Sequence, residues 1–147
     1  MDTNFEDLRS WKNPKARVKI MKGHFVTTHS HVNTYIDLST MKSRCNNARE
    51  TAKVMAEPYL ASTEIDTIVC LDGMEVVGAF LAEQLLAAGV SSMNAHETIY
   101  VTAPEKGFQD RFTFGENLIP LIHRKNVLIL AGAVSTGMTV RACLDAV

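Results

Sequence analysis

The residues in this sequence that are best suited to chemistry lie in one short stretch near its C-terminal end: Ser135, Thr136, Gly137, Met138 and Thr139. A continuous apolar run precedes them at Val127–Leu130 and predicts a strand that is buried on both faces. A helical pattern follows them, with Val140, Leu144 and Val147 on its apolar face. A strand, a small polar loop and a helix start form an anion site, because free N–H groups, the helix dipole and hydroxyl groups converge there. The alternative is an ordinary strand-to-helix turn with a serine or threonine cap.

Polar residues also follow a second predicted strand. The apolar run Asp66–Leu71 predicts this strand, and Asp72, Gly73 and Met74 come directly after it. Ligands of open α/β sheets bind beyond the carboxyl ends of the strands. We therefore expect this turn to lie beside the 135–139 loop and to share its ligand.

The longest irregular stretch of the sequence is Ala103–Asn117, which follows a third predicted strand at Thr98–Thr102. It contains glycines and a proline together with the cations Lys106 and Arg111. Long loops in compact domains are usually functional or disordered. We interpret this one as a mobile lid over the site, and the alternative is a plain surface loop.

Histidines gather in and beside the segment Phe25–Leu38. This segment is rich in β-branched and aromatic residues, which predicts a hairpin or two short extended segments. His29 and His31 are two residues apart, so in a strand they share a face, and His24 is close by. A metal site is one interpretation. No carboxylate or cysteine completes it at a telling spacing, so we favour histidines that face a ligand or solvent.

The remaining elements are predicted to be helices. The segment Asp7–Met21 reads as helical with a break near Pro14. Phe5, Leu8 and Trp11 lie three residues apart and form an apolar stripe that is either a local lid or a partner surface. Further helices are predicted at Ser43–Leu60 and Glu75–Ala88. Strands that alternate with helices indicate an α/β fold with a largely parallel sheet. The expected organisation is a single domain, 1–147, with an N-terminal helical segment at 1–24 and an α/β core at 25–147.

Composition narrows the class of protein. A chain of 147 residues that is 46% hydrophobic and 21% charged is typical of one globular domain. Its formal net charge of −1 offers no electrostatic case for nucleic acid as a partner. No stretch is apolar enough to cross a bilayer, and the polar N-terminus does not read as a signal peptide, so a cytoplasmic location is expected. Cys70 and Cys143 lie in apolar runs and are predicted to be buried thiols.

In this order of elements and in its 135–139 loop the chain resembles the type I phosphoribosyltransferases, and among them the orotate phosphoribosyltransferases most closely. The loop matches the family's Thr/Ser-Thr-Gly-x-Thr motif, and Tyr35 and Asp37 match the end of a Tyr-x-Asp segment further upstream. The resemblance covers the chain from about Phe25 onward. It implies transfer of a phosphoribosyl group from phosphoribosyl pyrophosphate to a pyrimidine-type base, with release of pyrophosphate.

The resemblance also implies roles for individual residues. Ser135, Thr136, Gly137, Met138 and Thr139 would grip the 5′-phosphate; Asp72, Gly73 and Met74 would form the pyrophosphate loop; Lys106, Arg111 and Asp72 would be the catalytic residues; and Thr28, His29 and Tyr35 would contact the base. A homodimer is implied, and Mg²⁺ would be carried with the substrate. The chain stops within the helix after the phosphate loop where family members continue, which makes a C-terminally truncated chain one interpretation.

The chain departs from the family at the acidic pair that precedes the phosphate loop. Ala131 and Gly132 stand in its place, and neither has a side chain that accepts hydrogen bonds from ribose hydroxyls. Two rival functions therefore stay open. One is a binding module for phosphoribosyl pyrophosphate or a nucleotide that kept the fold and the phosphate loop, and the other is a structural dimer partner.

Overall fold

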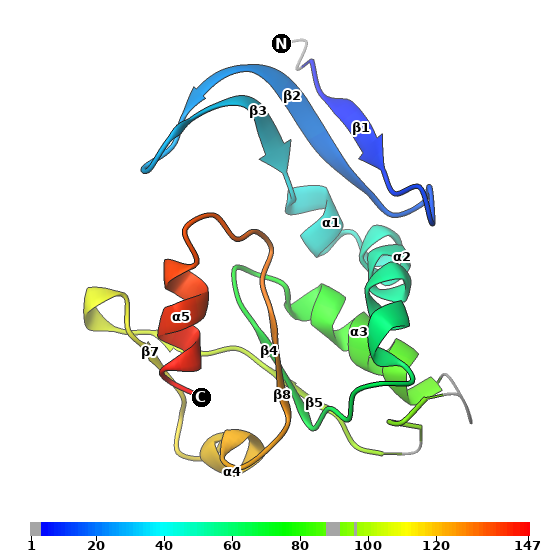
Figure 1. Ribbon diagram of the computed structural model, residues 1–147, viewed down its shortest axis with the longest axis vertical. Coiled ribbons are helices and arrows are strands. Elements are labelled where there is room, and N and C mark those ends of the chain that lie inside the picture. Colours follow the sequence, from blue (N-terminus) through cyan, green and yellow to red (C-terminus); the bar gives the residue numbers. More distant parts are fainter. Residues whose placement is uncertain (1–3, 88–91, 96) are drawn as a thin grey trace.

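The computed structural model describes residues 4–87, 92–95 and 97–147 (Figure 1). Its centre is a three-stranded parallel sheet in the order β5-β4-β8, formed by Tyr100–Thr102, Thr67–Cys70 and Val127–Leu130. Every residue of β4 is buried, as a continuous apolar run in a middle strand requires. The three predicted strands and the mixed α/β class are therefore confirmed. The expected burial of Val127–Leu130 on both faces is wrong in part, because β8 lies at the edge of the three-stranded sheet and only Leu130 is fully buried.

One face of this sheet is covered by α2 (Cys45–Ala56) and α3 (Glu75–Ala87). The short α1 (Ser39–Ser43) leads into α2, and the 3₁₀ turn η1 (Glu57–Tyr59) follows it at Pro58. The core on this side comprises alanines of α2, large apolar residues of α3 and alternate residues of β4: Ala48, Ala52, Ala56, Val77, Leu81, Leu85, Ile68 and Cys70. Both predicted helices are confirmed, although the last predicted residue of α3, Ala88, lies outside the described residues.

The opposite face of the sheet carries α5 (Met138–Leu144) and the segment between β5 and β8. The expected apolar face of α5 is wrong in part. Cys143 is its fully buried residue and packs on Val69 and Leu71 of the central strand, whereas the side chain of Leu144 is 60% exposed. Neighbouring residues lie about 100° apart around a helix, so a helix that packs through Cys143 turns Leu144 outward.

The stretch Ala103–Asn117 is less irregular than predicted. It contains a small antiparallel hairpin of β6 (Glu105–Lys106) and β7 (Phe112–Thr113), joined through the 3₁₀ turn η3 (Phe108–Asp110). Its apolar residues Phe112 and Phe114 pack against the buried residues of the α5 face. The connector after it forms a short helix, α4 (Ile119–Ile122).

The prediction of an N-terminal helical segment is wrong. Residues 6–37 form an antiparallel sheet of β1 (Glu6–Arg9), β2 (Arg17–Val26) and β3 (His31–Asp37). Around Asn13 and Pro14 the chain turns back instead of starting a helix, because the Asn13 carbonyl accepts a hydrogen bond from the Ala16 N–H at 2.9 Å. Pairing of β1 with β2 and of β2 with β3 satisfies the backbone groups that a helix would have bonded locally. The hairpin expected at 25–38 is confirmed for its turn and for β3, but its first strand, β2, begins at Arg17, well before the predicted range.

Asn47 fastens this N-terminal sheet to α2. Its buried side chain accepts a hydrogen bond from the Arg17 N–H at 3.2 Å and donates one to the Arg17 carbonyl at 2.9 Å. Beyond this attachment the β2–β3 hairpin extends away from the parallel sheet (Figure 1). Within the described ranges, no helix combines the length and the apolar character that a membrane crossing needs.

The two cysteines predicted to be buried are buried, and Cys45 is exposed. Burial, with a smaller contribution from the Glu75 carboxylate, raises the pKa of the Cys70 thiol to about 12. Burial also raises the pKa of the Cys143 thiol. Both groups are therefore neutral thiols that pack as small apolar side chains.

Candidate functional site

The first part of the candidate site is the turn at the carboxyl end of β4. Asp72 and Gly73 both have left-handed backbone conformations, with φ angles of 57° and 77°. These two residues reverse the chain so that α3 begins directly afterwards at Glu75. The turn is exposed at Asp72 and Gly73, whereas the side chain of Met74 is buried in the core. Asp72 and Gly73 can therefore face a ligand, and Met74 can do so only through its backbone.

The second part follows the neighbouring strand β8. The Leu71 N–H donates a hydrogen bond to the Leu130 carbonyl at 2.8 Å, which holds the two strand ends side by side. The chain then runs through residues 131–137 into α5, and Gly137 takes a left-handed φ of 77° at the helix start. A Cβ atom on Gly137 would meet nothing within 4 Å, so the space in front of this turn is open.

The polar side chains of the 135–139 loop are available to a ligand. Ser135, Thr136 and Thr139 are all exposed. The Thr136 hydroxyl accepts a long hydrogen bond of 3.4 Å from the Met138 N–H, which orders the turn. The loop therefore presents three hydroxyl groups beside the strand end, as the sequence predicts for an anion-binding turn.

Lys42 lies between these two parts, and sequence reasoning did not identify it. Its ammonium group donates a hydrogen bond to the backbone carbonyl of Asp72. Its Cε and Nζ atoms lie only 2.9 and 3.1 Å from where a Cβ on Gly132 would be. Gly132 thus permits a close approach of the lysine, and one cation serves both loops. An anion held at this edge would meet a positive charge supplied by α1.

The position of Lys42 depends on how α1 begins. The Asp37 carboxylate accepts hydrogen bonds from the Ser39 hydroxyl at 2.6 Å and the Ser39 N–H at 2.9 Å. These hydrogen bonds lower the pKa of the Asp37 carboxyl group. The carboxylate at the end of β3 therefore orients the first turn of the helix that carries Lys42. Tyr35 and Asp37, which matched the Tyr-x-Asp segment of the family resemblance, differ in role, because only Asp37 bonds the start of this helix.

The two cations proposed as catalytic, Lys106 and Arg111, lie on the β6–β7 hairpin. The Gly107 N–H donates to the Arg111 carbonyl at 2.8 Å, which closes the hairpin. The side chain of Arg111 is exposed, and no hydrogen bond or ion pair among the described residues joins it to Asp72 or to the 135–139 loop. The structure therefore places this cation on a neighbouring segment and does not bring it into contact with the site.

The residues predicted to contact the base lie on the β2–β3 hairpin. Thr28 and His29 are exposed in its turn, and the Tyr35 ring packs against the rings of Phe5 and Phe25 at centroid distances of 6.3 and 5.7 Å. No contact recorded for the described part of the chain joins these three residues to the carboxyl edge of the parallel sheet.

The expected face shared by His29 and His31 is wrong, because His29 lies in the turn and not in the strand. His31 pairs across the hairpin with His24 instead, at 3.0 Å between Nδ1 and Nε2. In the described ranges, no group of three or more histidine, cysteine, aspartate or glutamate side chains is arranged to hold a metal ion.

Comparison of the chain with protein-family models, with curated proteins and with solved structures gave no significant match.

Proposed function

We propose that the carboxyl edge of the parallel sheet binds a phosphorylated ribose, and that the chain is a type I phosphoribosyltransferase-like domain most similar to orotate phosphoribosyltransferases. One observation carries this proposal. The Asp72-Gly73 turn and the loop after β8 are adjacent, and Lys42 contacts both of them. Adjacent loops at the carboxyl ends of parallel strands are where α/β sheets bind their ligands.

The proposed reaction divides the substrate between the two loops. The N–H groups and hydroxyls of residues 135–139 hold the 5′-phosphate, while Lys42 and the Asp72-Gly73 turn face the pyrophosphate. A nitrogen of the base, having given up its proton to solvent, forms a bond to C1′ of the ribose, and the bond from C1′ to the pyrophosphate oxygen breaks with its electron pair leaving on that oxygen. The protein then contributes position and positive charge for the departing group.

The residues at this edge are compatible with Mg²⁺ carried by the substrate. Mg²⁺ is commonly held by one or two carboxylates together with phosphate oxygens and water, and the exposed Asp72 carboxylate can supply one such ligand. When bound, the ion would neutralise charge on the leaving pyrophosphate. Lys106 and Arg111 on the β6–β7 hairpin are the further cations that we propose for this task.

The second candidate function is a binding module without efficient catalysis. Lys42 occupies the space beside Gly132, and the acidic pair of the family motif is replaced by Ala131 and Gly132. Without those carboxylates, no side chain at these two positions can hold the ribose hydroxyls. Losing a hydrogen bond to a charged group costs about 1.5–3 kcal/mol, which slows turnover about 10- to 100-fold. We therefore expect measurable substrate binding with weak or undetectable turnover.

Calorimetry with phosphoribosyl pyrophosphate and Mg²⁺ tests the binding part of the proposal. Thr139→Val removes one hydroxyl of the phosphate loop and is expected to weaken binding about tenfold. Thr98→Val is the matched control, because Thr98 is exposed and precedes β5 at the opposite edge of the sheet. Equal affinities of the wild type and the Thr139→Val protein, or no binding at all, would refute the proposed site.

A pyrophosphate-release assay with orotate and a panel of other bases separates the two functions. The double variant Ala131→Asp and Gly132→Asp is expected to raise turnover or ribose-phosphate affinity. The backbone allows this test, because the φ angle of Gly132 lies outside the left-handed region, and the crowding atoms belong to the flexible end of Lys42. Brisk turnover by the wild-type chain would exclude the binding-module reading.

A further inference from the structure

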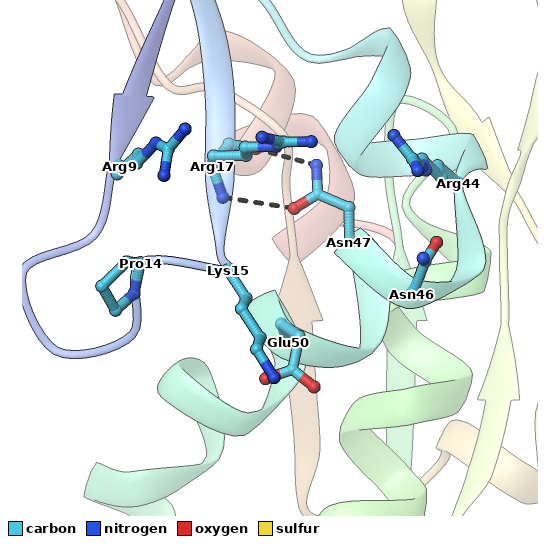
Figure 2. Close-up of a pocket in the computed structure, with 8 residues that line it drawn as sticks. All are labelled: Arg9, Pro14, Lys15, Arg17, Arg44, Asn46, Asn47 and Glu50. Carbon is cyan, nitrogen blue, oxygen red and sulfur yellow. Dashed lines mark hydrogen bonds between the residues drawn. The ribbon is translucent and has the colours of Figure 1, made fainter.

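A cavity lies apart from this edge, between the β1–β2 hairpin and the start of α2 (Figure 2). Its volume is about 400 Å³, which falls in the range of small-molecule sites. Figure 2 shows Arg9 and Arg17 on the side of the strands and Arg44 and Asn46 on the side of the helix. Lys15 lies below them, so four cationic side chains line one pocket.

Neighbouring carboxylates offset only part of this charge. Asp7 pairs with Arg17 at 2.9 Å and lies 3.7 Å from Arg9. Glu50, the one carboxylate that lines the pocket, accepts hydrogen bonds from Asn13 at 2.7 Å and from Lys53 at 2.9 Å.

Arg44 differs from the other arginines of the pocket. No hydrogen bond or ion pair of its guanidinium group occurs among the described residues. Its five N–H donors therefore point to no protein acceptor, and the first turn of α2 contains no acidic residue that could serve as one. Counting Asp7 and Glu50 against the four cations leaves a formal excess of two positive charges.

The chemistry of the lining selects the ligand. Guanidinium groups bind phosphate oxygens through paired N–H donors, and the Asn46 amide adds a neutral donor. A second hollow of about 440 Å³ shares Arg17, Arg44 and Asn47 with the first, so the basic surface continues beyond one phosphate group. A pocket of about 400 Å³ matches the size of a small molecule, whereas a long nucleic acid strand needs a charged groove that follows its backbone.

We propose that this basic pocket is a second binding site, distinct from the carboxyl edge of the sheet, for a phosphorylated small molecule that carries at least two negative charges. None of its lining residues belongs to the Asp72-Gly73 turn or to the 135–139 loop. Binding there would join the N-terminal sheet to α2 across Arg17 and Arg44, so occupancy should also stabilise the attachment that Asn47 makes.

Inorganic pyrophosphate is the probe for this site, followed residue by residue by amide chemical shifts in NMR. The amides of Arg17, Asn46 and Asn47 should shift on titration. Arg44→Gln should weaken binding at these amides about tenfold. Lys125→Gln is the control, because it removes one exposed positive charge outside the pocket and should change the affinity less than about twofold.

Two further variants are measured in the same titration. Lys15→Gln is a second pocket variant that should also weaken binding, which covers a failure of Arg44→Gln to fold. Thr139→Val should leave the shifts at Asn46 and Asn47 unchanged, which separates this site from the phosphate loop. Absent shifts at these amides, or equal losses for Arg44→Gln and Lys125→Gln, would overturn the proposal. Tighter binding of a single-stranded oligonucleotide than of pyrophosphate would overturn the choice of a small molecule.

Discussion

Gly78 of α3 lies against the central strand so closely that a single methyl group should destabilise the fold. A Cβ atom at this position would be 2.4 Å from the Sγ atom of Cys70 and 3.3 Å from Cγ1 of Val101. Cys70 is 1% exposed and sits on β4, so its sulfur atom cannot swing into solvent. The methyl group would have to push the helix and the sheet apart.

The expected size of the effect is a difference between two terms. Gly78→Ala improves helix propensity by about 1 kcal/mol. Overpacking a filled core costs about 1–3 kcal/mol, and the very short contact with sulfur puts this site in the upper half of that range. The free energy of unfolding should therefore fall by about 1–2 kcal/mol, which lowers the Tm of a domain of this size by roughly 2–8 °C.

Urea unfolding followed by circular dichroism measures this change, and a double-mutant cycle identifies its cause. Adding Cys70→Ala to Gly78→Ala removes the clashing sulfur, so the pair should be more stable than the sum of the two single changes predicts. Ala79→Gly on the exposed side of α3 measures the difference in helix propensity between alanine and glycine without a packing change, and should lower the free energy of unfolding by about 1 kcal/mol. An increase in stability for Gly78→Ala would refute the close packing of α3 on β4.

Four further outcomes are expected. A thiol reagent at neutral pH should modify Cys45 alone, and denaturant should expose the buried Cys70 and Cys143 to it. Because the folded pKa of Cys70 is about 12 against an ordinary 9.0, its contribution to stability should be present below pH 9 and lost as the pH rises towards 12, which unfolding curves at stepped pH would reveal. Asn47→Ala should cost about 1–3 kcal/mol in urea unfolding, since it leaves the partly buried N–H and carbonyl of Arg17 without these partners, and an unchanged midpoint would contradict that attachment. Amide exchange across residues 103–117 should slow when phosphoribosyl pyrophosphate binds; equal protection with and without ligand would exclude a lid.

The sequence by itself determined the parallel sheet and its turns. The apolar runs at Thr67–Cys70 and Val127–Leu130 are short and β-rich, so pairing in a buried sheet was the simplest way to remove them from water. Their order decided how far each is buried, since β4 in the middle is buried throughout and β8 at the edge is half-buried. The left-handed conformations of Gly73 and Gly137 also follow from local chemistry, because glycine adopts them without steric cost. These features depend on residues that are neighbours in the chain.

Only the tertiary structure decided the N-terminal sheet. Apolar residues at Phe5, Leu8 and Trp11 are spaced three apart and suggest a helix, but Glu6–Arg9 gains backbone partners in β2 across a hairpin turn. Pairing of this kind depends on residues eight to fourteen positions away, and a local period does not report it. The exposure of Leu144 on α5 was also decided by tertiary packing, because the helix docks on the sheet through Cys143.

The contacts that build the two proposed sites are more distant still. Lys42 reaches the Asp72 carbonyl across 30 residues of sequence, and the crowded position at Gly132 is farther along the chain. Arg44 meets Arg17 only because α2 docks on the N-terminal sheet through Asn47. The sequence does not reveal such groupings of charged side chains, because Coulomb interactions depend on the distance between the charges and not on their separation along the chain.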